Sequence, residues 1–123
     1  MKGGDFTDRQ GLFDYVMKEY GDEPEYPWAK DFTSAVLRHE TNKKWYGLVM
    51  NIPKSRLGLP SEEAADILNV KCDPLLIDIL KQSDGFFPAY HMNKTHWLTV
   101  LLDGTVPDEQ VCGLLDDSFK MTL

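Results

Sequence analysis

The first stripe of apolar residues along the chain predicts a helix that ends at Gly21. Its apolar members are three or four positions apart, as one face of a helix requires: Leu12, Phe13, Val16, Met17 and Tyr20. Thr7 and Gln10 have the spacing of a capping box and place the start of the helix just after Thr7. Glycine adopts the left-handed geometry that ends many helices, so Gly21 marks the other end.

Two β-prone runs follow, at residues 32–40 and 44–52, and they predict a β-hairpin. The short polar link between them contains Asn42, a residue type that tolerates left-handed backbone geometry. The second arm alternates two partly apolar sets, Tyr46, Leu48, Met50 and Ile52 against Trp45, Gly47, Val49 and Asn51. Before the hairpin, the acids and prolines of residues 22–27 predict a loop, after which Trp28 is expected to fold back onto the core.

A strand predicted over residues 66–72 leads into a second helix. Asp73 is a suitable N-cap, and Pro74 suits the first helical position. The apolar stripe expected to be buried in this helix consists of Leu75, Leu76, Ile79 and Leu80. After it, Pro88 makes residues 86–90 an edge strand or an irregular extended segment, because proline cannot donate a ladder hydrogen bond.

The end of the chain predicts one more strand and one more helix. Residues 96–102 are rich in strand formers, Asp103 and Gly104 predict a turn, and Pro107 opens a helix. The apolar positions of that helix are Val111, Leu114, Leu115 and Phe119. Most links are too short for crossover helices, so we expect an α+β fold, with a small, mostly antiparallel sheet packed against helices on one face.

The composition is that of one folded domain over residues 1–123, with 42% hydrophobic and 27% charged residues. No apolar run approaches the roughly 20 residues that cross a bilayer, and residues 1–8 lack the apolar core of a signal peptide. We therefore expect a cytoplasmic protein with no membrane partner. Cys72 and Cys112 lie far apart among apolar neighbours and are expected to be buried thiols.

The net charge of −7 opposes a generally phosphate-seeking surface, but the charge is unevenly distributed. Residues 31–60 hold two acidic and five basic side chains, the latter being Arg38, Lys43, Lys44, Lys54 and Arg56. These cations surround the predicted hairpin beside two aromatic residues, a combination that nucleic-acid surfaces use, and they point to weak, salt-sensitive DNA binding. The alternative interpretation is that lysines at a hairpin turn only keep a sheet edge soluble.

The most individual stretch of the sequence runs from residue 88 to residue 108. The run PAYHMNKTHW at 88–97, continuing through LDG at 102–104 and VPD at 106–108, resembles the signature of the MmcQ/YjbR-like family, and KCDP at 71–74 matches the same family. This resemblance implies a compact fold similar to frataxin-like proteins and to double-wing DNA-binding domains. Small bacterial proteins of this family are often labelled as DNA-binding.

The polar residues of this motif have two interpretations. In the structural one, Asn93 and Lys94 form a turn, Trp97 supplies a large buried ring, and His91 and His96 bond backbone groups of an irregular segment. In the functional one, these residues form a rim that contacts a partner. The structural interpretation is favoured, because motif residues at a strand entrance commonly serve packing.

The sequence contains no recognisable catalytic or metal-binding set. His91 and His96 are five positions apart, and no CxxC or HxxxH pair supplies further metal ligands, so we expect neither a metal nor a cofactor. Dispersed candidates such as His39, Cys72 and Asp103 give no basis for an enzyme. Two hypotheses remain, a domain that binds DNA through the basic hairpin and, alternatively, a protein-interaction or adaptor module that uses its acidic helical surface.

Overall fold

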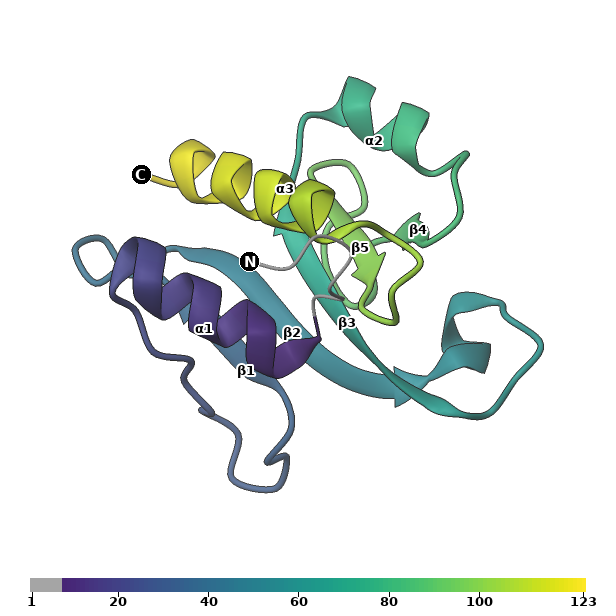
Figure 1. Cartoon of the computed structure of the whole chain (residues 1–123), viewed down its shortest axis with the longest axis horizontal. Coiled ribbons are helices and arrows are strands. Elements are labelled where there is room, and N and C mark those ends of the chain that lie inside the picture. Colours follow the sequence, from purple (N-terminus) through teal and green to yellow (C-terminus); the bar gives the residue numbers. More distant parts are fainter. Residues whose placement is uncertain (1–7) are drawn as a thin grey trace.

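The computed structural model describes residues 8–123 as a five-stranded sheet with three α-helices and one short 3₁₀ helix (Figure 1). In chain order the elements are α1 (Arg9–Tyr20), β1 (Ala35–Arg38), β2 (Trp45–Pro53), η1 (Lys54–Leu57), β3 (Ala64–Lys71), α2 (Pro74–Leu80), β4 (Phe86–Pro88), β5 (Trp97–Leu101) and α3 (Asp108–Met121). The strand order is β1-β2-β3-β5-β4, and every neighbouring pair is antiparallel. The structure thus confirms the expected α+β fold.

All three helices pack on one face of the sheet. Residues from α1, α2 and α3 share a single buried cluster with the side chains that β1, β2, β3 and β5 direct to that face. The central strands alternate faces residue by residue, and Leu68 and Val70 face the helices whereas Ile67 lies on the opposite side. No helix in the described part of the chain is long and apolar enough to span a bilayer.

Both edges of the sheet are short. At one edge, β4 has three residues and ends in Pro88, as the proline predicted. At the other edge, the outer side of β1 is occupied by the loop that precedes it, because Glu25 and Val36 exchange two backbone hydrogen bonds of 3.0 and 2.8 Å. The outer side of β1 is therefore already paired at that point.

Helix α1 ends where the sequence predicts, but the structure caps its start with a different residue. Gly21 has φ 74° and its N–H bonds to the carbonyls of Val16 and Met17. At the other end, the Asp8 carboxylate accepts the N–H of Gly11 at 2.8 Å. Thr7, expected as the capping residue, lies outside the described residues, and the helix begins one position later than a Thr7 cap would place it.

A β-bulge in the hairpin changes the predicted pattern of faces in β2. Leu37 pairs with Gly47 whereas Arg38 pairs with Trp45, so Tyr46 is an extra residue in the ladder. The bulge turns Tyr46 into the core beneath the helices and leaves Trp45 on the opposite face. The predicted alternation holds from Gly47 onward and is wrong for these two aromatic residues.

The link of the hairpin also differs in detail from the prediction. Lys43, rather than Asn42, adopts the left-handed geometry, with φ 65°. The Asn42 side chain accepts the N–H of Lys44 at 2.8 Å and donates to the carbonyl of Thr122 at 3.0 Å. Asn42 therefore fixes the turn against the end of α3.

Helix α2 has the predicted cap and part of the predicted buried face. Asp73 accepts the N–H of Leu75 at 2.8 Å with Pro74 at the first position. Ile77 is fully buried, and Leu76 and Leu80 of the expected stripe are partly buried against the core, whereas Leu75 and Ile79 are 77% and 63% exposed. A seven-residue helix turns only about twice, so Leu76, Ile77 and Leu80 make up its inner face and the positions two away from Ile77 point outward.

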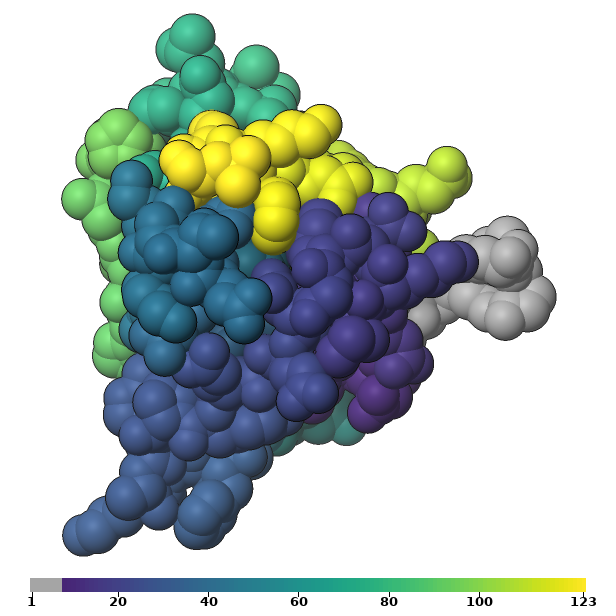
Figure 2. Space-filling view, turned by 90° about the vertical axis from the view of Figure 1, so that its left-hand side faces the viewer, coloured from purple at the N-terminus to yellow at the C-terminus, as the bar shows by residue number. Residues whose placement is uncertain are grey.

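Tyrosine hydroxyls join the helices to one another and to the sheet. Tyr15 and Tyr20 of α1 both donate to the Asp116 carboxylate of α3, and Figure 2 shows α1 beside the end of α3. Tyr46, which has no exposed surface, donates to Asp22 at 2.6 Å. Burial above all, then the hydrogen bond to Asp22 and its charge, raises the pKa of Tyr46 well above the ordinary value.

The raised pKa of Tyr46 predicts a loss of stability in alkali. Above about pH 10 the unfolded chain loses the phenolic proton while folded Tyr46 retains it, so the free energy of unfolding falls as the pH rises. The slope is about 1.4 kcal/mol per pH unit for one such tyrosine. In urea unfolding between pH 9 and 11.5, the free energy of unfolding of Tyr46→Phe should fall less steeply with pH than that of the parent protein, by that amount. The free energy of unfolding of Tyr26→Phe, an exposed control, should fall as steeply as that of the parent. Equal slopes for the Tyr46 variant and the parent would contradict this assignment.

Candidate binding site on the open sheet face

The face of the sheet opposite the helices, here called the open face, is apolar but only partly covered. A second, smaller buried cluster lies there, made of Ile52, Ala65, Ile67 and Leu101. Side chains from η1, from the loop after it and from β4 and its following segment pack against this cluster: Leu57, Leu59, Phe87 and Tyr90. The cover ends before it reaches the β1–β2 side of the sheet. An apolar surface remains open there.

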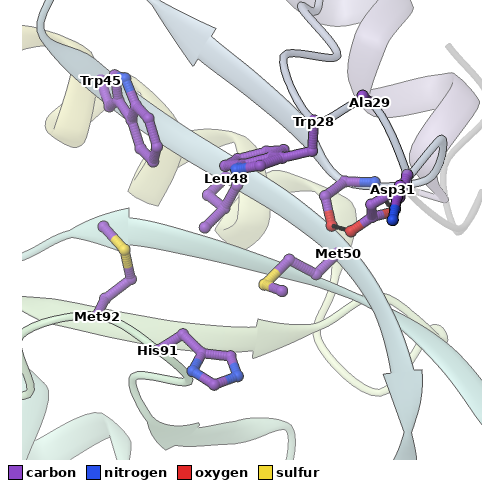
Figure 3. A pocket seen from close by; sticks show the side chains of 10 residues that line it. Trp28, Ala29, Asp31, Trp45, Leu48, Met50, His91 and Met92 are labelled. Atoms are coloured by element: carbon purple, nitrogen blue, oxygen red, sulfur yellow. Dashed lines mark hydrogen bonds between the residues drawn. The ribbon is translucent and has the colours of Figure 1, made fainter.

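A groove of about 720 Å³ occupies the uncovered part of the open face. In Figure 3, Trp28 and Trp45 stand on one side, Met92 and His91 on the other, and Leu48 and Met50 form the floor. The lining is completed by Ala29, Lys30, Asp31 and Ser34. This size and this mixture of aromatic, thioether and few polar groups are those of a ligand site.

The two tryptophans of the groove come from different elements. Trp45 is placed on this face by the bulge in β2, and Trp28 belongs to the connection between α1 and β1, which projects from the body of the molecule in Figure 2. Their rings meet edge to face with centroids 6.1 Å apart. Trp28 is 39% exposed, so the expectation that it folds back onto the core is wrong.

Asp31 holds the end of the projecting connection in shape. Its carboxylate accepts the Ser34 hydroxyl at 2.5 Å, the Thr33 N–H and hydroxyl, each at 2.9 Å, and the Ser34 N–H at 3.1 Å. These hydrogen bonds, that of the Ser34 hydroxyl first, hold the pKa of Asp31 well below its usual range. The hydrogen bonds of Asp31 therefore fix one rim of the groove.

The motif segment between β4 and β5 is held over the sheet by a buried polar pair. The Thr99 hydroxyl donates to the side chain of Asn69, Tyr90 donates its N–H to Thr99 at 2.9 Å, and Asn69 donates to the Tyr90 carbonyl at 3.2 Å. These three residues satisfy one another where the sheet has no helix above it. No local pattern of residues indicates this pair, because Asn69 and Thr99 lie 30 positions apart.

Asn93 and Lys94 shape the motif segment as the structural interpretation expects. Asn93 accepts the N–H groups of Thr95 and His96 at 2.8 and 3.3 Å, and the Lys94 ammonium donates to the Ala89 carbonyl at 2.8 Å. The expectation that His91 and His96 bond backbone groups is wrong, because neither imidazole bonds a backbone group of residues 8–123. Both histidines are exposed, and Trp97 is only partly buried.

His91 lies between the groove and a second cavity. Its φ is 60°, the left-handed region that residues with a Cβ rarely adopt, and its ring meets Tyr90 edge to face with centroids 4.1 Å apart. The second cavity, of about 350 Å³, is lined by Arg56, Leu57, Phe87, Pro88, Ala89, Tyr90, His91 and Lys94. Of the residues in the rim interpretation, His91 lines both cavities and Lys94 lines the second, whereas Asn93, His96 and Trp97 line neither.

The five cations of the predicted basic hairpin do not converge. Arg38 pairs with Glu25 at 2.8 Å, and Lys54 lies 3.5 Å from Glu63 and 3.9 Å from Asp103. Lys43 and Lys44 are exposed at the turn before β2, and Lys54 and Arg56 lie beyond its other end. A strand of nine residues separates these ends by roughly 26 Å.

Within residues 8–123, no three His, Cys, Asp or Glu side chains are grouped so that they could hold a metal ion. Cys72 and Cys112 are free thiols, buried and partly buried respectively. Burial, helped by the nearby carboxylates of Asp116 and Asp108, raises the pKa of Cys112 to about 11, which makes it a weak nucleophile.

The groove residues were missed from the sequence for a local reason. Trp28 and Met92 lie in irregular segments, and Trp45 shares the groove with Met50 only because of the bulge. The one available sign was the density of large apolar residues in the loop before the hairpin, at Tyr26, Trp28 and Phe32. A loop that displays so many of them without burying them is typical of a binding surface.

The left-handed backbone of His91 predicts an unusual order of stability among its variants. His91→Ala should be less stable than His91→Gly by about 1 kcal/mol, because only glycine adopts this geometry without steric cost. At the neighbouring Met92, which is not left-handed, the alanine variant should be the more stable of the two. Urea unfolding of the four variants measures both differences, and a His91→Ala protein as stable as His91→Gly would contradict the prediction.

Known proteins share both the sequence and the fold of this chain. The sequence model of the YjbR family matches residues 17–121. The Bacillus subtilis protein YyaQ, described as uncharacterized, is 43% identical over 114 residues, which cover 93% of this chain and 97% of YyaQ. Escherichia coli YjbR, also described as uncharacterized, is 39% identical over 57 residues, 46% of this chain and 48% of that protein.

Solved structures agree with this grouping. A crystal structure of a Pseudomonas syringae protein has a TM-score of 0.93 and 41% identity, covering 95% of this chain and 100% of the other. A crystal structure of a Deinococcus radiodurans protein has a TM-score of 0.71 and 26% identity, covering 94% of this chain and 78% of the other. The family match over residues 17–121 and the identity with YyaQ along nearly its whole length lead to one assignment: this chain belongs to the YjbR family.

Proposed function

We propose that this chain is a non-enzymatic domain that binds nucleic acid, with unpaired bases lying in the groove of the open face. The observation that carries the proposal is the groove itself, where Trp28 and Trp45 present aromatic surface above a floor of Leu48 and Met50. Aromatic side chains on an open sheet are a general means of binding single strands, because every base has a face that stacks on them.

The charges around the groove favour an anionic partner. The groove and the adjoining cavity together are lined by Lys30, Arg56 and Lys94 and by one carboxylate, Asp31. The chain as a whole has the opposite balance, with 13 basic and 20 acidic residues. A phosphate backbone on the open face would therefore meet local positive charge and lie across the sheet from the carboxylates of α1 and α3.

The proposed contact surface is the open face rather than the hairpin turn that the sequence indicated. Lys43 and Lys44 adjoin Trp45 and extend the surface at one end, in the manner of the wing that the family resemblance implied. Arg38 and Lys54 contribute less, because nearby carboxylates neutralise their charge. Binding through so few free cations should be weak and sensitive to salt.

The groups in the groove favour binding over catalysis. The Ser34 hydroxyl is hydrogen-bonded to Asp31, whose low pKa makes it a poor base, so this pair does not activate Ser34 as a nucleophile. His91 lies across the groove, among the side chains opposite Trp28 and Trp45 (Figure 3). A site without an activated nucleophile is consistent with a domain that holds its ligand unchanged.

Trp28→Ala tests the proposal directly. The parent protein should bind an oligothymidylate of about twelve nucleotides at low salt, and the variant should bind it roughly 5- to 150-fold more weakly, since one stacked base contributes about 1–3 kcal/mol. Phe32→Ala is the matched control, because Phe32 belongs to the same connection, is 80% exposed and does not line the groove. Fluorescence anisotropy of the labelled oligonucleotide gives Kd for each protein.

Two outcomes would refute the open-face site. One is the absence of oligothymidylate binding even at low salt, and the other is equal binding by the parent and Trp28→Ala. Duplex DNA bound as tightly as the single strand, and lost when Lys43 and Lys44 become glutamate, would instead support the hairpin as the contact surface.

A protein partner is the second candidate, and one observation on α2 favours it. Leu75 and Ile79 form an exposed apolar pair on the outer side of this helix, next to the acidic residues Asp73 and Asp78. If this helical surface holds a protein, Leu75→Glu combined with Ile79→Glu should abolish recovery of a specific partner from a cell lysate. Arg56→Gln should leave that recovery intact, and equal recovery by both variants would exclude the α2 surface.

A further inference from the structure

The second cavity of the open face, next to the groove, differs from it in chemistry. Of its eight lining residues, three carry nitrogen donors on their side chains, namely Arg56, His91 and Lys94, and a fourth, Tyr90, carries a hydroxyl. No aspartate or glutamate is among them. We propose that this cavity, called here the anion pocket, binds a phosphate group.

The donors of the anion pocket come from two separate segments. Arg56 belongs to η1, which follows β2, and the other three belong to the connection between β4 and β5. The Arg56 guanidinium reaches the Tyr90 hydroxyl at 3.3 Å, which places the two segments across the pocket from each other. A tetrahedral anion between them would receive hydrogen bonds from both sides.

Most of the donor capacity in the anion pocket is unused. Arg56 has five N–H donors and makes the one hydrogen bond to Tyr90, with no carboxylate partner in residues 8–123. Lys94 uses one of its three donors on the Ala89 carbonyl. Arg38 and Lys54, by contrast, face carboxylates that already balance their charge. In the anion pocket, the positive charge of Arg56 and Lys94 is thus left without a carboxylate partner among residues 8–123.

The backbone around the anion pocket is already fixed without a ligand. Asn69 and Thr99 hold Tyr90 by its carbonyl and its N–H, and Lys94 is tied to Ala89. His91 is held in left-handed geometry, a conformation that folded proteins retain where the surrounding structure imposes it. A pocket ordered in this way orders few groups on binding, and this favours affinity for a small ligand.

The inference rests on the proposed function only for the identity of the larger ligand. Because His91 lines both cavities, a molecule with a flat ring in the groove and a phosphate in the anion pocket would span the two. A mononucleotide and a nucleotide within a strand share this chemistry. Inorganic phosphate probes the anion pocket alone.

The test is a phosphate titration followed by amide NMR shifts at constant ionic strength, with chloride replaced by phosphate. The expected result is a saturable shift of the amides of Arg56 and of residues 90–94. Arg56→Gln should weaken phosphate binding about tenfold, the effect of losing a charge-assisted hydrogen bond. Lys18→Gln is the control, because this lysine is exposed on α1, away from the open face. Arg56 is itself exposed, so its replacement should leave the fold intact.

The anion pocket is overturned if phosphate causes no saturable shift, or if Arg56→Gln binds phosphate as tightly as the parent. Thymidine 5′-monophosphate then separates this inference from the proposed function. If it binds more tightly than inorganic phosphate and Trp28→Ala removes the difference, both are supported. If phosphate binds while neither the mononucleotide nor oligothymidylate gains from Trp28, the anion pocket stands and the nucleic-acid proposal fails. If oligothymidylate binds and phosphate does not, the nucleic-acid proposal stands and the anion pocket fails.

Discussion

The sheet of this protein is apolar on both faces, and the three α-helices of residues 8–123 all pack on one of them. Leu68 and Val70 alternate with Ile67 along β3, so neither face could be left in water at no cost. The three α-helices pack on one face, and η1, β4 and loops cover part of the other. The groove is the part of the open face that remains uncovered, so the shape of this face depends on how far the loops extend.

The motif between β4 and β5 is one part of this cover, through Tyr90. A buried asparagine and threonine in the sheet replace the apolar contacts that a helix would make, and they bind the backbone of Tyr90 instead. The sequence of the motif is therefore constrained by the need to lie flat on a sheet and still present polar side chains. The residues that fix the path of this segment adjoin those that border the two cavities.

Most of the fold could be predicted from the sequence, because local signals determine it. Gly21, Pro88 and the Asp73-Pro74 pair each mark a boundary through their own backbone chemistry. The faces were harder to predict. The bulge at Tyr46 depends on pairing with β1, and the buried side of α2 depends on where a seven-residue helix rests on the sheet. The site was largely hidden for the same reason, because Trp28, Trp45 and His91 meet only in the tertiary structure, whereas the five cations that are close in sequence lie at opposite ends of β2.

The short edges of the sheet determine how such a domain can be approached. One edge strand has three residues and ends in a proline, and the outer side of the other is already bonded to the loop at Glu25. An extended peptide therefore has little free backbone on which to add a further strand, and two copies cannot readily join their sheets edge to edge. Recognition by β-augmentation, as well as the aggregation that exposed edges cause, is therefore disfavoured by this construction.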